Sequence, residues 1–245
     1  MDLKTLNKIT GNDKYAGTKA GFLNVMAKYG GVLNEPAVFA QVLAQVIVET
    51  GGFKYTEELW GPTAAQRGYD GRADLGNVKQ GDGSRFRGYG LIQVTGRANA
   101  RAFTSWVRAN IDPKAPNFED FPNLMATPDW AALTVVWYFM TRNGLLEYAR
   151  AGNNEMVTRR VNGGLNHYTE RLAAYEKAAL IMLGYEGRLR EFQADNGLIA
   201  DGITGPLTRK AMHEELTAIK ADVPVASSGG IVALIVAIIK GLFGK

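Results

Sequence analysis

The clearest pattern along the chain is a series of segments with helical periodicity. Between Tyr15 and Tyr29, apolar residues recur at helical spacing until Gly30-Gly31, which predicts an amphipathic helix. The next segment begins with Pro36, is apolar on nearly every side from Ala37 to Glu49 and ends at Gly51-Gly52. This second pattern predicts a helix buried in the middle of a domain.

Further helices are expected later in the chain. Thr127-Pro128-Asp129 is a cap that opens an aromatic-rich helix, and the periodicity predicts helices at about 154–161 and 169–183. Residues 60–97 are instead rich in glycine and charge, and only 85–95 alternates enough to allow short strands or one hairpin. The patterns together predict a mainly α fold with a small β element.

The chain divides into three regions. Residues 1–184 form one predicted domain, and 185–219 form a helix-turn-helix unit that is too short to hold a core alone. Residues 220–245 are a linker followed by an apolar tail, Ile231 to Lys245, which is shorter than the ~20 residues that span a bilayer. We expect this tail to contact a membrane surface, the alternative being that it docks on its own domain or a partner.

Composition excludes several kinds of chemistry. The 245-residue chain has no cysteine and two histidines, so thiol nucleophiles, disulfides and thiolate zinc sites cannot occur. The net charge of +4 is modest and favours polyanionic partners in general. Met1 to Thr10 lacks the apolar stretch of a secretory signal, so we expect the protein to be made in the cytoplasm and to need help to reach a cell wall.

Glu49 is the first candidate for chemistry because it is a carboxylate at the C-terminal end of an apolar helix. Burial and the negative end of the helix dipole both favour its neutral form, as a general acid requires. The alternative is a glutamate that simply reaches solvent. After the glycine turn, Glu57 and Glu58 are candidates for the second carboxylate that glycoside hydrolysis needs, roughly 6.5–9.5 Å away when water attacks directly.

The glycine-rich, basic stretch from Lys79 to Gly90 does not predict a phosphate-binding loop. It lacks the Gly-Lys-Ser/Thr ending, and no buried parallel strand precedes it. Gln93, Thr95 and Asn99 follow at even spacing, which is compatible with one face of a strand that lines a groove or with ordinary surface residues.

Three separated motifs carry a family resemblance: VETGGF from Val48, FRGYGLIQVTGRAN from Phe86 and RVNGGLN from Arg160. In this order and spacing, roughly residues 10–184 resemble the glycoside hydrolase family 19 chitinases and, more closely, chitinase-like bacteriophage endolysins. The resemblance implies a lysozyme-like α+β fold and hydrolysis of β-1,4 bonds next to N-acetylated sugars. It also implies that neither a metal nor an organic cofactor takes part.

The resemblance also implies roles for individual residues. Glu49 is expected to be the acid and Glu58 the base that activates water. Thr95 is expected to help hold that water. Arg171 resembles the family's arginine near the second carboxylate, where it would keep Glu58 ionised. The residues expected to bind sugar are Gln93, Asn99, Asn162 and, within the second motif, Tyr89.

The chain departs from the family pattern at three places. Val48 stands where the family usually has histidine, and Tyr89 where it more often has arginine. Glu58 is followed by Leu59-Trp60 instead of the usual asparagine-containing run, so Glu57 stays as an alternative base.

The C-terminal unit carries a second resemblance. Residues 189–198 and 201–208 resemble the second half of a three-helix peptidoglycan-binding module. We expect the unit either to borrow the helix at 169–183 for its missing side and bind the wall, or to serve only in packing.

The sequence therefore favours an endolysin that hydrolyses bacterial peptidoglycan by an inverting acid/base mechanism, with the muramidase bond expected. Two alternatives are a chitinase of the same family and a wall-binding or membrane-active protein without catalysis. We expect a monomer that binds peptidoglycan and no nucleic acid, that waits in the host cytoplasm and that reaches the periplasm and cell wall at lysis.

Overall fold

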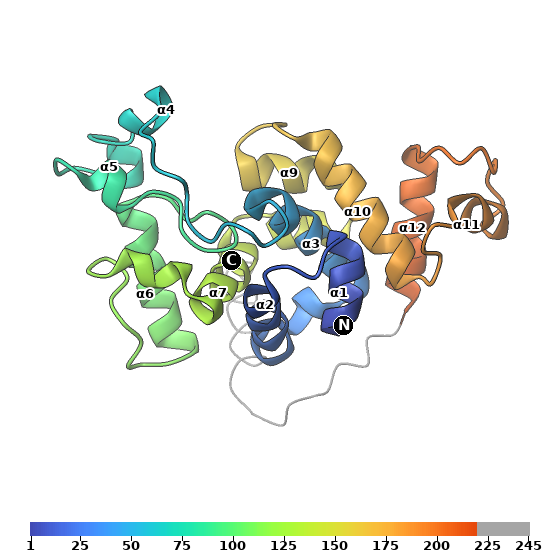
Figure 1. The fold of residues 1–245 in the computed structure, drawn as a ribbon, viewed down its shortest axis with the longest axis horizontal. Helices are drawn as coiled ribbons and strands as arrows, with labels where there is room; N and C mark the ends of the chain where they lie inside the picture. The colour runs from blue at the N-terminus through green and yellow to red at the C-terminus, as the bar shows by residue number, and fades with distance from the viewer. Residues whose placement is uncertain (220–245) are drawn as a thin grey trace, which may run out of the picture.

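The computed structural model describes residues 1–219, and nearly all of its regular structure is helical (Figure 1). The elements are α1 (Leu3–Thr10), α2 (Ala16–Tyr29), η1 (Gly31–Asn34), α3 (Pro36–Thr50), α4 (Ala64–Arg67), η2 (Ala73–Leu75), α5 (Asp82–Arg85), α6 (Arg97–Asn110), η3 (Pro122–Ala126), α7 (Pro128–Thr141), α8 (Leu145–Arg150), α9 (Asn154–Asn162), α10 (Tyr168–Met182), α11 (Leu189–Asp195) and α12 (Pro206–Ala218). The prediction of a mainly α fold is confirmed.

The central element is α3, the helix that carries Glu49. Pro36 is its first residue and Gly51, in the left-handed conformation at φ 58°, ends it, so the sequence signals at both ends were correct. The helix packs against α10, α8, α12 and η1. Because neighbours surround it, even its glutamines Gln41 and Gln45 are buried.

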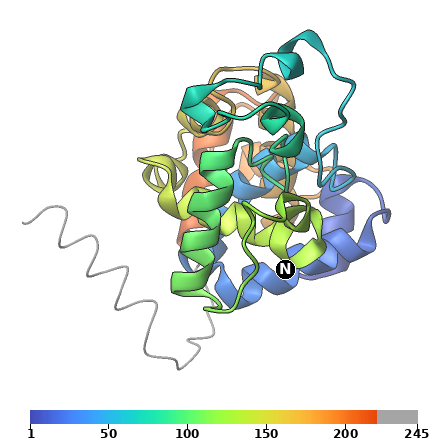
Figure 2. The same ribbon diagram turned by 90° about the vertical axis from the view of Figure 1, so that its left-hand side faces the viewer.

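A second packing layer joins α2, α6 and α7. The α2 and α7 helices pack together, and a chain of ring contacts links α6 to α7, with Phe103 and Trp137 5.5 Å apart between ring centres. The sequence patterns did not predict α6, since its arginines obscure the apolar stripe that includes Phe103 and Val107. Figure 2 shows this helix, in green, at the front of the molecule.

The glycine-rich region between α3 and α6 is an irregular lobe and not a hairpin. Within the described residues its β structure is limited to two isolated bridges, Glu57 with Tyr89 and Tyr89 with Val94. Gly90 (φ 81°) and Gln93 (φ 52°) both have left-handed backbones, which turn the chain before a strand can extend. The small β element is therefore reduced to these bridges.

The lobe is held to α6 by a network of ion pairs. Arg97 donates from Nε to Asp82 at 3.0 Å and from Nη1 to Glu119 at 3.1 Å. Arg101 donates to the same Glu119 at 2.8 Å. The pairing also neutralises part of the positive charge that the sequence concentrates here.

The C-terminal helical unit packs on the helices that precede it. Arg209 of α12 pairs with Glu176 of α10 at 2.9 Å, and Phe192 of α11 lies 5.3 Å from Tyr185 between ring centres. Met212 and Leu216 are buried in the common core. The unit therefore packs against α10, and whether it binds the wall stays a prediction. The expected apolar tail, Ile231 to Lys245, lies outside the described residues, and its membrane contact stays a prediction.

Across residues 1–219, none of the helices combines the length and apolarity that crossing a bilayer would require.

Replacing Gly90 with alanine is expected to lower the free energy of unfolding by about 3 kcal/mol. The new Cβ would force a left-handed backbone on a non-glycine residue and would lie 2.6 Å from Thr134 Cγ2. Gly17→Ala is the control, because a Cβ at this helical position meets nothing within 4 Å. Urea denaturation of both variants checks the prediction, and equal stabilities would contradict it.

The lobe network predicts a pH dependence of stability. Arg101 and then Arg97 lower the pKa of Glu119 from 4.5 to about 2. Its ionised form therefore stabilises the fold above pH 4.5, and this contribution is lost as the pH falls towards 2. The stability difference between the parent and Glu119→Gln, measured by denaturant titration, is expected to shrink over this range. A difference that stays constant with pH would count against the network.

Candidate active site

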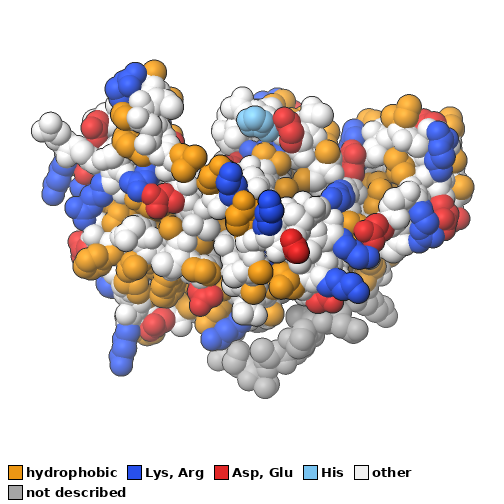
Figure 3. Space-filling view, in the orientation of Figure 1, with side chains coloured by type: hydrophobic (Ala, Val, Ile, Leu, Met, Phe, Trp, Pro, Cys, Tyr) orange, Lys and Arg blue, Asp and Glu red, His pale blue; other side chains and the backbone are white. Residues whose placement is uncertain are grey.

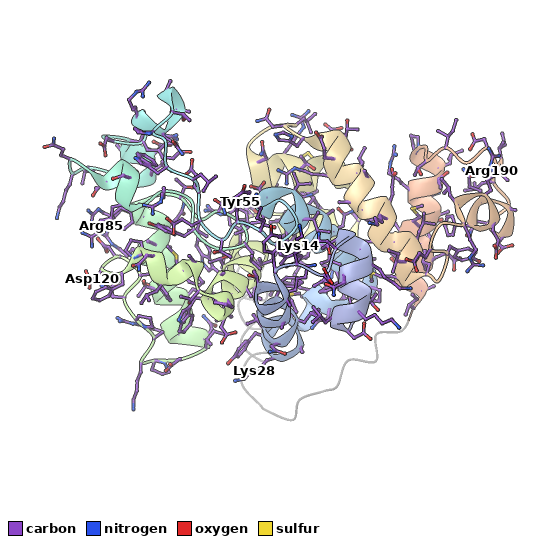
Figure 4. All side chains as sticks on the ribbon, in the orientation of Figure 1. Lys14, Lys28, Tyr55, Arg85, Asp120 and Arg190 are labelled. Atoms are coloured by element: carbon purple, nitrogen blue, oxygen red, sulfur yellow. The ribbon has the colours of Figure 1, made fainter. Side chains whose placement is uncertain are left out.

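The motifs picked out in the sequence come together where α3 ends. The loop after α3 carries Tyr55, which Figure 4 labels at the centre of the molecule. In Figure 3 the upper surface is hollowed between the α4–α5 lobe and the part formed by α9 and α10. The candidate residues come from the end of α3, the lobe, the start of α6 and the α9–α10 segment.

Glu49 is held by an arginine of α10, 122 positions later in the chain. Arg171 Nη2 donates to Glu49 Oε1 at 2.5 Å, and Nη1 of the same side chain donates to Gln45 Oε1 at 2.5 Å. The arginine side chain is 2% exposed and that of Glu49 is 16% exposed. The expectation that Arg171 would hold Glu58 is wrong, because α10 packs along α3 and brings the arginine to the acid.

Glu58 is held by uncharged donors. Its Oε2 accepts from the Gly88 backbone N–H at 2.9 Å. Its Oε1 accepts from Gln66 Nε2 at 2.9 Å and from the Tyr69 hydroxyl at 3.4 Å. Burial, followed by the nearby Glu58 charge, raises the pKa of Tyr69, so this hydroxyl keeps its proton.

The alternative base, Glu57, is committed to another contact. Arg87 donates to Glu57 Oε1 from both Nε, at 3.0 Å, and Nη2. Its side chain is 40% exposed. Of the two adjacent glutamates, Glu58 therefore has a carboxylate that the second motif fixes and that no cation of residues 1–219 neutralises.

Gln66 and Tyr69 are site residues that the sequence analysis missed. Gln66 closes a capping box with Thr63, and its Oε1 accepts from the Thr63 and Gly61 backbones while its Nε2 donates to Glu58. The pattern Thr63-x-x-Gln66 was visible in the sequence as a helix start. Nothing in it indicated that the glutamine would also hold a carboxylate.

The second motif turns sharply. Three of its residues that were expected at the substrate donate hydrogen bonds to nearby backbone carbonyls. Gln93 donates to the Gly90 carbonyl at 3.0 Å, and Thr95 Oγ1 donates to the Gln93 carbonyl at 3.1 Å. Asn99, in the first turn of α6, donates to the Thr95 carbonyl at 2.8 Å. All three side chains are partly exposed, so they can still meet a ligand.

Tyr89 does not fit the sugar-binding role expected of it. It is 2% exposed, and Arg87 lies over its ring at 5.0 Å. Its backbone forms both β bridges, so the residue sits inside the lobe and supports the loop. Asn162 differs, because its Oδ1 is buried and has no hydrogen-bond partner within residues 1–219. A ligand hydroxyl or amide would satisfy that acceptor.

Tyr138 and Arg142 of the aromatic helix and its end also belong to the site, although no motif singled them out. The Tyr138 hydroxyl donates to the carbonyls of Arg160 and Val161, next to Asn162. Its pKa is raised, mainly by burial, with Arg142 opposing and Glu49 adding to the rise. Arg142 also donates to Asn99 Oδ1 at 2.9 Å.

Within residues 1–219, no group of three or more acidic or histidine side chains is arranged to hold a metal ion.

Comparison with solved structures shows which known fold the chain resembles. Chitinase C from Streptomyces griseus HUT6037 matches with a TM-score of 0.54 and 22% identity, over 74% of this chain and 91% of that chain. A chitinase C mutant matches with a TM-score of 0.55 and 19% identity, over 74% and 76%. The chain has a chitinase-like fold.

Sequence comparison agrees with this chitinase-like fold. A glycosyl hydrolase family 19 domain-containing protein of Haemophilus influenzae (strain ATCC 51907 / DSM 11121 / KW20 / Rd) is 39% identical over 111 residues. The match covers 45% of this chain, and the chain spans about half the length of that curated relative. No family model matches the chain.

The anchoring of Arg171 predicts unequal effects for two neighbouring glutamines of α3. Gln45→Leu would leave one end of a buried guanidinium without its acceptor and is expected to lower the free energy of unfolding by about 1–3 kcal/mol. Gln41→Leu is the matched control, because within the described part of the chain both polar atoms of Gln41 are buried without a partner. The control is expected to be neutral or stabilising. Chemical denaturation measures both, and equal losses would refute the anchoring role.

Proposed function

We propose that the protein is a peptidoglycan hydrolase that cleaves β-1,4 glycosidic bonds by direct attack of water, with inversion. The observation that carries the proposal is the pair of differently held carboxylates: Glu49 on α3 and Glu58 in the lobe. The chitinase-like fold and the family 19 relative support a glycoside hydrolase, and we assign this pair to its centre.

In the proposed reaction Glu49 donates a proton to the leaving oxygen. Arg171 occupies Oε1, so Oε2 is the atom that would carry the proton to the glycosidic bond. The hydrogen bond from Arg171 and the rigid helix fix the direction of the carboxyl group. Such orientation lowers the activation free energy of the reaction, because the donor must reach one particular oxygen.

Glu58 would act as the base that takes a proton from the attacking water. Its three donors are uncharged groups that stabilise a carboxylate without pairing it with a cation. The Thr95 hydroxyl, which donates to the Gln93 carbonyl, keeps lone pairs free to accept from that water. Gln93, Asn99 and Asn162 are proposed to bind the sugars on either side.

Peptidoglycan is the proposed substrate because of the C-terminal unit. Its turn and the start of α12 expose three aliphatic side chains, Ile199 (84%), Ile203 (70%) and Leu207 (70%), on a unit that resembles half of a wall-binding module. Apolar residues at such exposures favour a binding surface. The proposed role is that of an endolysin, which stays in the host cytoplasm until the membrane opens and then degrades the wall.

The alternative substrate is chitin, which the solved chitinase C structures favour. Mass spectrometry of the fragments released from purified peptidoglycan and from chitin distinguishes the two. It also shows whether the muramidase bond is the one cut.

Glu49→Gln is expected to abolish lysis, with a rate loss of about 100-fold or more, because an amide cannot donate the proton. Turbidity loss of outer-membrane-stripped cells measures it. A variant that lysed cells as fast as the parent would refute the catalytic account and favour a wall-binding or membrane-active protein.

Substitutions of two adjacent glutamates test which residue is the base, and Glu57→Gln is the matched control. Glu58→Gln is expected to lose activity by a similar factor, whereas Glu57→Gln, which only breaks the contact with Arg87, is expected to keep most of it. The reverse pattern would transfer the role of base to Glu57.

A further inference from the structure

Arg142 is a charged residue at the site that the proposed acid and base leave unused. Its Nη2 donates to Asn99 Oδ1 at 2.9 Å. Its guanidinium carbon lies 4.7 Å from the centre of the Tyr138 ring and 5.5 Å from that of Trp137. These contacts hold the guanidinium beside an asparagine that is proposed to bind sugar.

Charge balance separates Arg142 from the other arginines of the site. Arg171 pairs with Glu49, and Arg87 pairs with Glu57. For Arg142, no carboxylate of residues 1–219 lies within 4.0 Å, and its buried Nε has no hydrogen-bond acceptor among them. A partly exposed guanidinium without a carboxylate partner favours a ligand that brings an acceptor and a negative charge.

The location of Arg142 places such a ligand next to the reacting bond. The Tyr138 hydroxyl lies close enough to both Arg142 and Glu49 for each charge to act on it. The same hydroxyl reaches the end of α9, where Asn162 lies. A glycan held by Asn99 and Asn162 beside Glu49 would therefore pass within reach of the guanidinium.

We propose that Arg142 binds a carboxylate carried by the substrate glycan. This inference rests on the proposed function and adds to it the residue that selects peptidoglycan over chitin. A planar guanidinium matches a carboxylate with two parallel hydrogen bonds, and chitin, a polymer of neutral sugars, offers no such group. In peptidoglycan the carboxylate belongs either to the lactyl group of muramic acid or to the peptide stem.

The test measures equilibrium binding by calorimetry in the full-length Glu49→Gln background, so that no ligand is consumed. Four ligands are compared: peptide-free glycan strands with free lactyl carboxylates, the same strands after methyl esterification, peptide-bearing strands and chitohexaose. Arg142→Gln is expected to weaken binding of at least one carboxylate-bearing strand about tenfold and to change the other two ligands less than twofold. Loss confined to the peptide-free or the peptide-bearing strands identifies the lactyl or the stem carboxylate.

Arg85→Gln is the matched control. Arg85 also stacks near an aromatic ring and donates to backbone carbonyls, yet Figure 4 shows it at the left edge of the molecule beside Asp120. It is expected to change none of the four affinities. Arg142→Lys, which keeps the charge but not the planar fork, is expected to fall between the parent and Arg142→Gln.

Two results would overturn the proposal: equal weakening for all four ligands, which would indicate a packing role beside Asn99, and no weakening for any. Cleavage of the same strands by the parent protein is scored separately. A parent that binds through Arg142 but cuts no strand would refute the proposed hydrolase activity without touching the carboxylate site.

Discussion

The buried guanidinium of Arg171 is the interaction on which the site depends. It joins two helices whose contacting residues are 122 positions apart, and it satisfies an amide and a carboxylate of α3 at the same time. Because the side chain is almost fully buried, removing either acceptor would leave charge or donors without compensation. Arg171 therefore couples the packing of α10 against α3 to the direction of Glu49.

That interaction shows where prediction from sequence succeeds and where it stops. The apolar run from Ala37 to Glu49, with Pro36 before it and Gly51 after it, was sufficient to predict α3 and its burial, since helix signals are local. The family resemblance also brought Arg171 to attention. The predicted partner of Arg171, Glu58, was wrong. The true partner depends on how two helices far apart in the sequence pack, and no pattern within either helix encodes that packing.

The lobe shows a second limit of prediction from sequence. Alternation between Arg85 and Thr95 suggested a hairpin, but left-handed backbones at Gly90 and Gln93 turn the chain and leave only bridges. The bridge between Glu57 and Tyr89 is what brings the Gly88 amide to Glu58. Tyr89 was expected to bind sugar. Instead its backbone forms both bridges and its side chain is buried in the lobe. Arg142 lies in no motif, and it is identified only by its position beside Asn99 and by the absence of a carboxylate partner among residues 1–219.

The two carboxylates differ in how they are supported, and the difference suits the roles proposed for them. Glu49 lies on a rigid helix with one oxygen tied to a cation, which restricts it to a single direction. Glu58 lies on a loop and accepts hydrogen bonds from neutral donors alone among the described residues, so its charge remains available to polarise a water molecule. The helix supplies direction and the irregular lobe supplies an uncompensated charge. The bridge between Glu57 and Tyr89 sets residues 56–58 beside residues 88–90, and this pairing presents the Gly88 amide to the Glu58 carboxylate. The one stretch of β pairing that the lobe retains on this side is therefore what prepares Glu58 for its proposed role.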